Sequence, residues 1–147
     1  MSETLATDLG SQYLERAPSM TALFPGTVHT LEYLREKGYH LYILTNGFLK
    51  TQQHKLKNSR IDHFFLRVFS SDERGVNKPS AEIFHWAVTS LNARKKDCLM
   101  IGDDLHVDVA GAMRYGIDAI WFNPHGDSGS HIPTGEIHSV EELRNWL

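Results

Sequence analysis

Short apolar runs alternate with segments of helical periodicity along this chain, and this alternation constrains the fold more than any other feature. The runs "YILT" (residues 42–45) and "LMIG" (residues 99–102) show no polar alternation, which is typical of strands buried on both faces. Strands are expected there and at "RVFSS" and "AIWF", with helices at residues 28–38, 50–58, 80–91, 106–115 and 139–147. Strands that alternate with helices form parallel sheets covered on both faces. The sequence therefore predicts an α/β fold with a three-layer, Rossmann-like parallel sheet.

The bulk composition is that of a globular protein with a hydrophobic core. The chain has 147 residues, of which 41% are hydrophobic and 22% are charged, and its formal net charge is −3. This charge gives no electrostatic reason to expect nucleic acid or an anionic membrane as a partner. The single cysteine, Cys98, lies in an apolar run, so we expect a reduced core residue and a cytoplasmic location. We see no signal peptide and no apolar stretch that would span a bilayer.

Polar side chains follow three of the expected strands at the point where each strand ends. Thr45 and Asn46 end the first strand, Lys78 lies in the loop after the second, and Asp103 and Asp104 end the third. In parallel α/β sheets, active sites lie beyond the carboxyl ends of the strands. This shared location favours a functional site more strongly than any one of these residues does.

These residue types suit phosphoryl transfer, in which an anionic substrate must meet an anionic attacking group. A Mg²⁺ ion and a lysine offset the negative charge, while a hydroxyl and backbone N–H groups hold the phosphoryl oxygens. Asp103 is the expected metal ligand, because Mg²⁺ takes one or two protein carboxylates and completes its shell with water and phosphate. Asp104 and Asp108 are expected not to bind the metal themselves but to orient Asp103 or the metal-bound waters. Thr45 and the backbone around Asn46 are expected to bind phosphoryl oxygens. Lys78 is expected to neutralise the negative charge of the phosphate and of the attacking group.

Each residue also has a purely structural interpretation. Asp104 is equally well placed to cap the helix that follows it, and an acid such as Asp108 in the first turn of a helix is favoured by the dipole. Lys78 by itself would be a solvated surface residue. The nine histidines lack metal-ligand spacing and are expected at the surface or in packing, although His106 lies near the acids.

At this point the sequence resembles a known family. The segments "ILTNG", "NKPSAEIF" and "MIGDDLHVDVAGA" look like three of the four motifs of the haloacid dehalogenase-like (HAD) hydrolases. The narrower match, through "LFPGTVHTLEYLREKGYHLYILTNG" and "IWFNP", is to pyrimidine 5′-nucleotidases. The resemblance implies a Mg²⁺-dependent phosphohydrolase with an aspartyl-phosphate mechanism. It also implies a small phosphorylated substrate, with a pyrimidine nucleoside 5′-monophosphate as one candidate.

The fourth family motif is an Asp-x-Asp that supplies the nucleophile at the end of a central strand. No aspartate of this chain opens such a motif after an apolar strand. We therefore expect the chain to be N-terminally truncated, without the central strand and most of the helical cap, and inactive alone. Residues 1–20 are expected to be a cap remnant and residues 21–147 a partial core. The strands that bear Thr45 and Asp103 should then either pair with each other or leave open apolar edges.

Two alternatives compete with this hypothesis. A receiver-like phospho-acceptor domain also combines acids, a threonine and a Lys-Pro pair, but its acids come first in the chain. A non-catalytic pseudoenzyme or binding module would keep the fold without the reaction. Within the family, dehalogenases, mutases and phosphonate-cleaving members share these motifs, so phosphate-ester hydrolysis is the leading hypothesis. The oligomeric state is left open.

Overall fold

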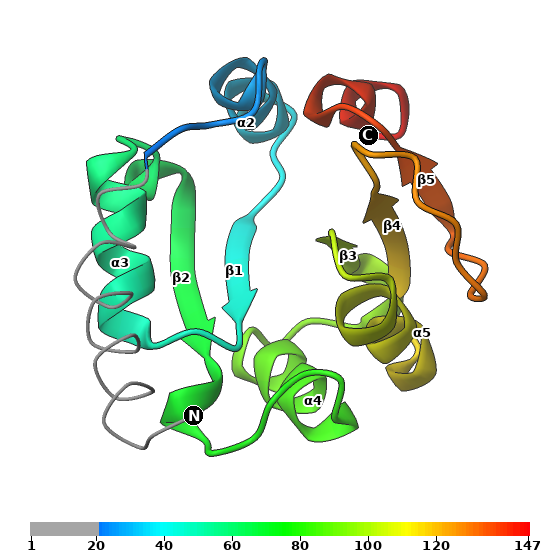
Figure 1. Cartoon of the computed structure of the whole chain (residues 1–147). Helices are drawn as coiled ribbons and strands as arrows, with labels where there is room; N and C mark the ends of the chain where they lie inside the picture. Colours follow the sequence, from blue (N-terminus) through cyan, green and yellow to red (C-terminus); the bar gives the residue numbers. More distant parts are fainter. Residues whose placement is uncertain (1–20) are drawn as a thin grey trace, which may run out of the picture.

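The computed structural model describes residues 21–147, which form an α/β arrangement of parallel strands and covering helices (Figure 1). The strands are β1 (Leu41–Thr45), β2 (Phe65–Ser70), β3 (Leu99–Gly102), β4 (Asp118–Phe122) and β5 (Gly135–Ile137). The α-helices are α2 (Thr27–Glu36), α3 (Leu49–Asn58), α4 (Ala81–Ser90) and α5 (Ala110–Tyr115). Shorter helical segments are η2 (Asp62–Phe64), η3 (Ser71–Glu73), η4 (Lys95–Asp97), η5 (Leu105–Val109) and η6 (Val140–Asn145). The predicted fold class is confirmed, while the expected cap remnant lies outside the described residues.

The five strands are divided between two parallel sheets. In the first, β1 pairs with β2, so that Thr45 lies opposite Ser70. The second has the order β3-β4-β5, with Ile101 opposite Ile120. Within residues 21–147 no ladder joins β1 to β3, and Figure 1 shows them facing each other across an opening. Of the two expected outcomes for these strands, pairing with each other is not found among the described residues.

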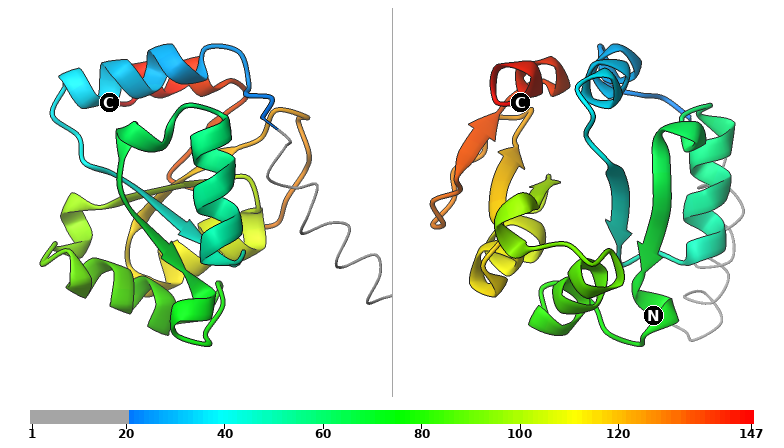
Figure 2. Two further views of the ribbon diagram at one scale, coloured as in Figure 1. Left: turned by 90° about the vertical axis from the view of Figure 1, so that its left-hand side faces the viewer. Right: turned by 180° about the vertical axis from the view of Figure 1, so that it is seen from behind.

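Helices lie on both sides of the strands. Two views place α2 and η6 together on one side and α4 and α5 on the other (Figures 1 and 2), while α3 packs beside β2. Inside residues 21–147 no helix is both long and apolar enough to cross a membrane. The layers predicted from the alternation of strands and helices are therefore present around the two sheets.

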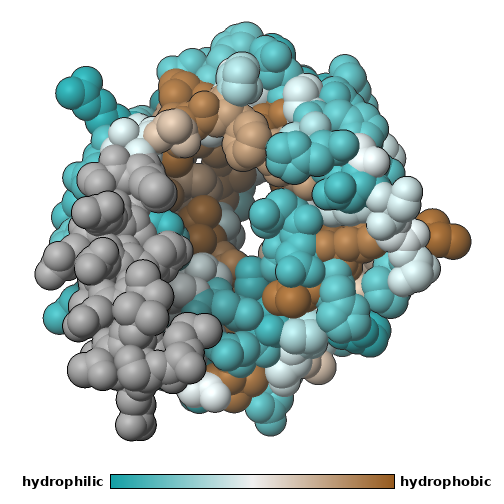
Figure 3. All heavy atoms as spheres, viewed as in Figure 1, coloured by the Kyte–Doolittle hydropathy of each residue, from teal (hydrophilic) through white to brown (hydrophobic). Residues whose placement is uncertain are grey.

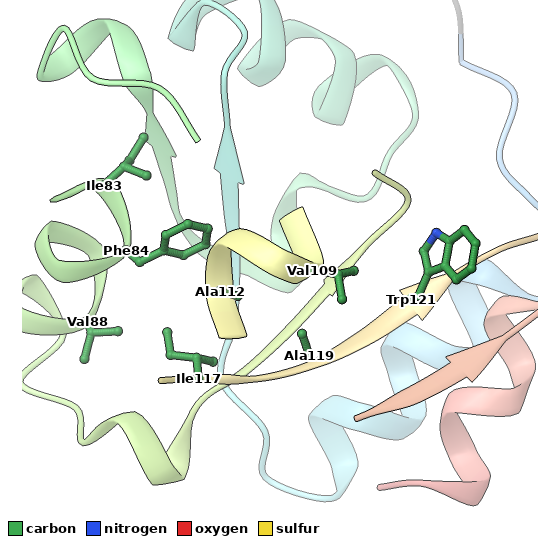
Figure 4. Packing of buried hydrophobic residues seen from close by; sticks show 8 residues of the cluster. All are labelled: Ile83, Phe84, Val88, Val109, Ala112, Ile117, Ala119 and Trp121. Atoms are coloured by element: carbon green, nitrogen blue, oxygen red, sulfur yellow. The ribbon is translucent and has the colours of Figure 1, made fainter. Parts of the chain in front are cut away.

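The larger hydrophobic core lies between α4, α5 and the β3-β4 pair (Figure 4). Its buried members are Ile83, Phe84, Val88, Val109, Ala112, Ile117, Ala119 and Trp121. A smaller cluster on the opposite face joins Ile120 to Ile137 and Leu143. Successive β4 side chains thus enter different clusters, as the two-residue period of a strand requires.

Several local details differ from the sequence-based expectations. A short strand, β5, lies between β4 and the closing helix, where the sequence pattern predicts none. The closing helix is the 3-10 segment η6, begun by a Ser139–Glu142 capping box. The expected helix at 106–115 begins as a π-helical turn, η5, and continues as α5. Cys98 is half-buried rather than fully buried, and burial raises the pKa of its thiol.

Candidate active site

Asp103 follows the carboxyl end of β3 and is exposed. Its backbone carbonyl accepts a hydrogen bond from the Trp121 indole at 3.0 Å, which fixes the chain at this point. No hydrogen bond or ion pair engages its side chain within the part of the chain that the structure describes. The residue borders a cavity of about 520 Å³. Asp103 therefore presents two oxygens to solvent from a held backbone.

Asp104 caps the helical segment that follows. Its Oδ1 accepts hydrogen bonds from the backbone N–H groups of His106 at 2.9 Å and Val107 at 2.7 Å. These bonds satisfy two of the donors that the start of a helix leaves without partners. The structure thus gives Asp104 the capping role, and its expected role beside a metal stays a prediction.

Lys78 and Asp108 form a buried ion pair that spans the opening between the two sheets. Lys78 Nζ lies 2.7 Å from Asp108 Oδ1, and the two side chains are 9% and 8% exposed. The same ammonium donates to the Leu44 carbonyl of β1 at 2.9 Å. On the other side, Asp108 packs so closely against Gly102 that a Cβ there would lie 2.4 Å from the Asp108 Cβ. One lysine therefore ties the carboxyl end of β1 to the carboxyl end of β3.

Asn46 positions the backbone of Lys78. Its Oδ1 accepts from the Lys78 N–H at 2.8 Å, and its Nδ2 donates to the Lys78 carbonyl at 3.0 Å. This reciprocal pair holds the loop after β2 against the end of β1. Thr45 Oγ1 accepts from the Gly47 N–H at 3.0 Å, which leaves the hydroxyl proton available as a donor. The side chains predicted at phosphoryl oxygens thus also shape the loops that surround them.

Ser70 and Asp72 belong to this edge, and the sequence reasoning missed them. Ser70 is fully buried, and its Oγ lies 2.6 Å from the Gly47 carbonyl and in direct contact with the Asp72 carboxylate. The hydrogen bond from Ser70 is the main cause that holds the pKa of Asp72 below its ordinary value. The sequence signal is the serine that ends the strand in "RVFSS", and the structure places this residue opposite Thr45. Sequence analysis considered the polar residues at the ends of the other strands, and the same consideration of the last residue of β2 would have identified Ser70.

The described histidines form no metal site. Within residues 21–147, no group of three or more His, Cys, Asp or Glu side chains is arranged to hold a metal ion. His106 lies 3.3 Å from His131, between Nδ1 and Nε2, and so links η5 to the loop before β5. A hard cation with few protein ligands still fits the site, because Asp103 offers an exposed carboxylate and Mg²⁺ keeps several waters.

The fold and this site together define a class of protein: parallel α/β chains that collect acids, a lysine and a hydroxyl at one sheet edge. Comparison with known proteins then gives the family. A model of the haloacid dehalogenase-like hydrolases matches residues 4–116. The chain belongs to this family.

Individual relatives include sugar-phosphate and nucleotide phosphatases. The chain is 41% identical to a glyceraldehyde 3-phosphate phosphatase of Pyrococcus abyssi over 98 residues, covering 67% of this chain and 41% of that protein. It is 36% identical to the pyrimidine 5′-nucleotidase PynA of Streptococcus pneumoniae, covering 83% of this chain and 53% of the relative. The narrower resemblance to pyrimidine 5′-nucleotidases is thereby confirmed among the homologues. The chain spans about half the length of these curated relatives.

A solved structure shows the same fold. The putative HAD-hydrolase YfnB from Bacillus subtilis, described as bound to magnesium, superposes with a TM-score of 0.88 at 31% identity. The match covers 95% of this chain and 61% of the YfnB chain. The arrangement of residues 21–147 is therefore that of a HAD hydrolase over most of its described length.

Proposed function

We propose that this chain carries the metal- and phosphate-binding part of a phosphate-monoester hydrolase site. Asp103 would hold Mg²⁺, while Thr45 and the backbone beside Asn46 would bind phosphoryl oxygens. The observation that carries the proposal is the Lys78 bridge, because it brings the ends of β1 and β3 together beside the exposed Asp103. Bound Mg²⁺ would supply positive charge that stabilises the phosphoryl oxygens.

The charges of the site support a cation there. Lys78 has one positive charge, and the Asp108 carboxylate already lies 2.7 Å from its ammonium group. Asp103 and Asp104 add two negative charges beside this neutralised pair. An anionic phosphate would be repelled by them without a further cation. A divalent ion at Asp103 offsets that repulsion.

The proposed substrate is a small phosphate monoester. Relatives named for glyceraldehyde 3-phosphate and for pyrimidine 5′-nucleotides support this class. We further propose that the chain alone does not turn over such an ester, because none of its aspartates opens the Asp-x-Asp motif that supplies the nucleophile in the family. A non-catalytic binding module that keeps the metal and phosphate contacts is the second candidate, and it is favoured by the same absence.

Metal binding tests the site directly. The unbound Mn²⁺ signal in electron paramagnetic resonance would be titrated with the wild-type chain and with Asp103→Asn. We expect Asp103→Asn to weaken Mn²⁺ binding by about tenfold or more, since one carboxylate ligand is lost. Asp118→Asn is the matched control, because Asp118 begins β4 at the opposite edge of the sheet, and it should bind as the wild type does. Equal Mn²⁺ affinity in all three proteins would refute the metal site.

Turnover is measured separately with p-nitrophenyl phosphate and Mg²⁺. We expect no release of nitrophenol above the rate in buffer. Release that is abolished by Asp103→Asn would show that the chain holds a nucleophile of its own, and the proposed inactivity would be wrong. No release together with Asp103-dependent Mn²⁺ binding would support the incomplete site.

A further inference from the structure

The loop that follows β4 is closed by a buried side chain. Asn123 is 2% exposed, and its Oδ1 accepts a hydrogen bond from the Asp127 N–H at 2.9 Å. Its Nδ2 donates to the Asp127 carbonyl at 2.9 Å and to Glu136 Oε1 at 2.7 Å. A buried polar network that is fully hydrogen-bonded rigidifies the segment that contains it. We call residues 123–127 the Asn123 loop, and these bonds hold its backbone in one conformation.

The Asn123 loop begins beside Asp103. Gly102 lies opposite Trp121 in the ladder between β3 and β4, so the residues that follow these two strands leave the sheet at the same edge. The Trp121 indole also donates to the Asp103 carbonyl at 3.0 Å, which ties the two strand ends together. Active sites of parallel α/β sheets lie at this edge. The loop is thus fixed in place beside the proposed metal ligand.

Two side chains of the Asn123 loop border the same cavity as Asp103. His125 and Asp127 are both exposed, and both line the cavity of about 520 Å³ that Asp103 also lines. The hydrogen bonds from Asn123 engage only the backbone of Asp127, so the carboxylate of Asp127 is not needed to hold the loop. A rigid loop that presents polar side chains to a cavity is well suited to bind a ligand.

The other walls of the cavity are apolar. Phe24, Phe122 and Leu143 line it, and the rings of Phe24 and Phe122 meet edge to face at 4.9 Å. Figure 3 shows hydrophobic surface around a hollow between the two halves of the molecule. Hydrogen bonds to a ligand are therefore expected at Asp103 and at the Asn123 loop rather than at the apolar walls.

The charges around the cavity select the chemistry of a ligand. Among residues 21–147, no lysine or arginine lines this cavity, while Asp127 brings a carboxylate to the loop and Glu136 contacts Asn123. A second anionic group on a phosphate ester would be repelled there. Hydroxyl groups suit these residues better, because a hydroxyl can donate to the Asp127 carboxylate and can donate to or accept from the His125 imidazole.

We propose that the Asn123 loop binds the alcohol part of the phosphate ester, and that this part is uncharged and carries several hydroxyl groups, as a sugar does. Asp127 accepts a hydrogen bond from one hydroxyl, and the His125 imidazole forms a second. This inference rests on the proposed function, because the phosphate must lie beside Asp103 for the alcohol part to reach the loop. His125 and Asp127 then determine specificity and take no part in the transfer of the phosphoryl group.

Binding is measured by NMR titration of the ¹⁵N-labelled chain in excess Mg²⁺. The probes are inorganic phosphate, D-ribose 5-phosphate, and 3-phosphoglycerate, whose alcohol part carries a carboxylate. We expect ribose 5-phosphate to bind at least about tenfold more tightly than inorganic phosphate, because it adds hydrogen bonds to the loop. The amide signals of residues 125–127 should shift with ribose 5-phosphate and stay unchanged with inorganic phosphate. The carboxylate of 3-phosphoglycerate should prevent any such gain in affinity.

Two variants remove the proposed contacts. His125→Ala and Asp127→Asn should each weaken the binding of ribose 5-phosphate by about fivefold or more and leave the binding of inorganic phosphate unchanged. The matched controls are His40→Ala and Asp118→Asn, because His40 precedes β1 and Asp118 begins β4, at the opposite edge of the sheets. Both controls should bind all three probes as the wild type does. The same spectra show that each variant remains folded.

The outcomes distinguish this inference from the proposed function. Binding of inorganic phosphate without a gain for ribose 5-phosphate would overturn the role of the Asn123 loop and leave the proposed function in place. A gain that neither His125→Ala nor Asp127→Asn reduces would do the same. Tighter binding of 3-phosphoglycerate than of ribose 5-phosphate would show that the site accepts a charged alcohol part, and it would overturn the inference equally. No binding of any of the three probes would overturn both.

Discussion

The Lys78 ammonium shows how much the environment of one residue can differ from its sequence context. Followed by proline in a polar loop, a lysine is ordinarily solvated, yet its side chain here is 9% exposed and contacts both Asp108 and the Leu44 carbonyl. Taking both charges out of water is costly, and their mutual attraction offsets that cost only while both partners are present. Loss of either partner would therefore leave an uncompensated charge inside the protein.

Asp108→Asn should be strongly destabilising for this reason. The amide is nearly isosteric with the carboxylate but leaves the buried ammonium without a counter-charge, so we expect a loss of about 3 kcal/mol in the free energy of unfolding by urea. The control is Asp97→Asn, which breaks the Arg94–Asp97 pair of 2.5 Å, whose side chains are 72% and 47% exposed. That change should cost much less stability, because solvent screens an exposed ion pair. Similar losses in the two variants would contradict the buried role of the Lys78–Asp108 pair.

At the scale of the element, the end of β3 and the start of η5 are fitted to each other. Asp104 caps η5, while Asp108, one turn later, returns to lie against Gly102 at the end of β3. The close packing of η5 against the end of β3 therefore requires glycine at position 102.

Gly102→Ala tests this close contact. A methyl group at Gly102 would lie 2.4 Å from the Asp108 Cβ, so either the strand end or the ion pair must shift. We expect a loss of at least about 2 kcal/mol in the free energy of unfolding. Gly47→Ala is the matched control, because its methyl would meet the flexible end of Gln52 at the same distance, 2.4 Å, and Gln52 can move aside. Equal stability of the two variants would contradict the tight packing of Gly102 on Asp108.

For the whole molecule, the division into two sheets should govern local stability. The Lys78 bridge and the core around α4 and α5 hold the halves together, but no backbone ladder crosses between β1 and β3 within residues 21–147. Regions with exposed backbone hydrogen-bonding groups and little burial open most easily.

Amide hydrogen exchange of the free chain should therefore be uneven across the strands. We expect residues 119–121 of β4 to be among the slowest to exchange, because β4 has a neighbour on each side. The amides of β1 and β3 on the edges that have no neighbouring strand within residues 21–147 should exchange at least about tenfold faster. Uniform protection across β1, β3 and β4 would mean that another chain or another conformation covers these edges in solution.

The amino-acid sequence by itself determined the α/β class, most strand and helix positions and the polar strand ends, because periodicity, helix caps and turn residues act over short distances. Its motifs also led to the family. The burial of Lys78, the place of Ser70 and the three-residue strand β5 could be seen only in the tertiary structure, since each depends on residues far apart in the chain. The absence of a ladder between β1 and β3 within residues 21–147 likewise came only from the tertiary structure, because strand pairing requires a neighbour at the right distance and direction, which local sequence does not encode.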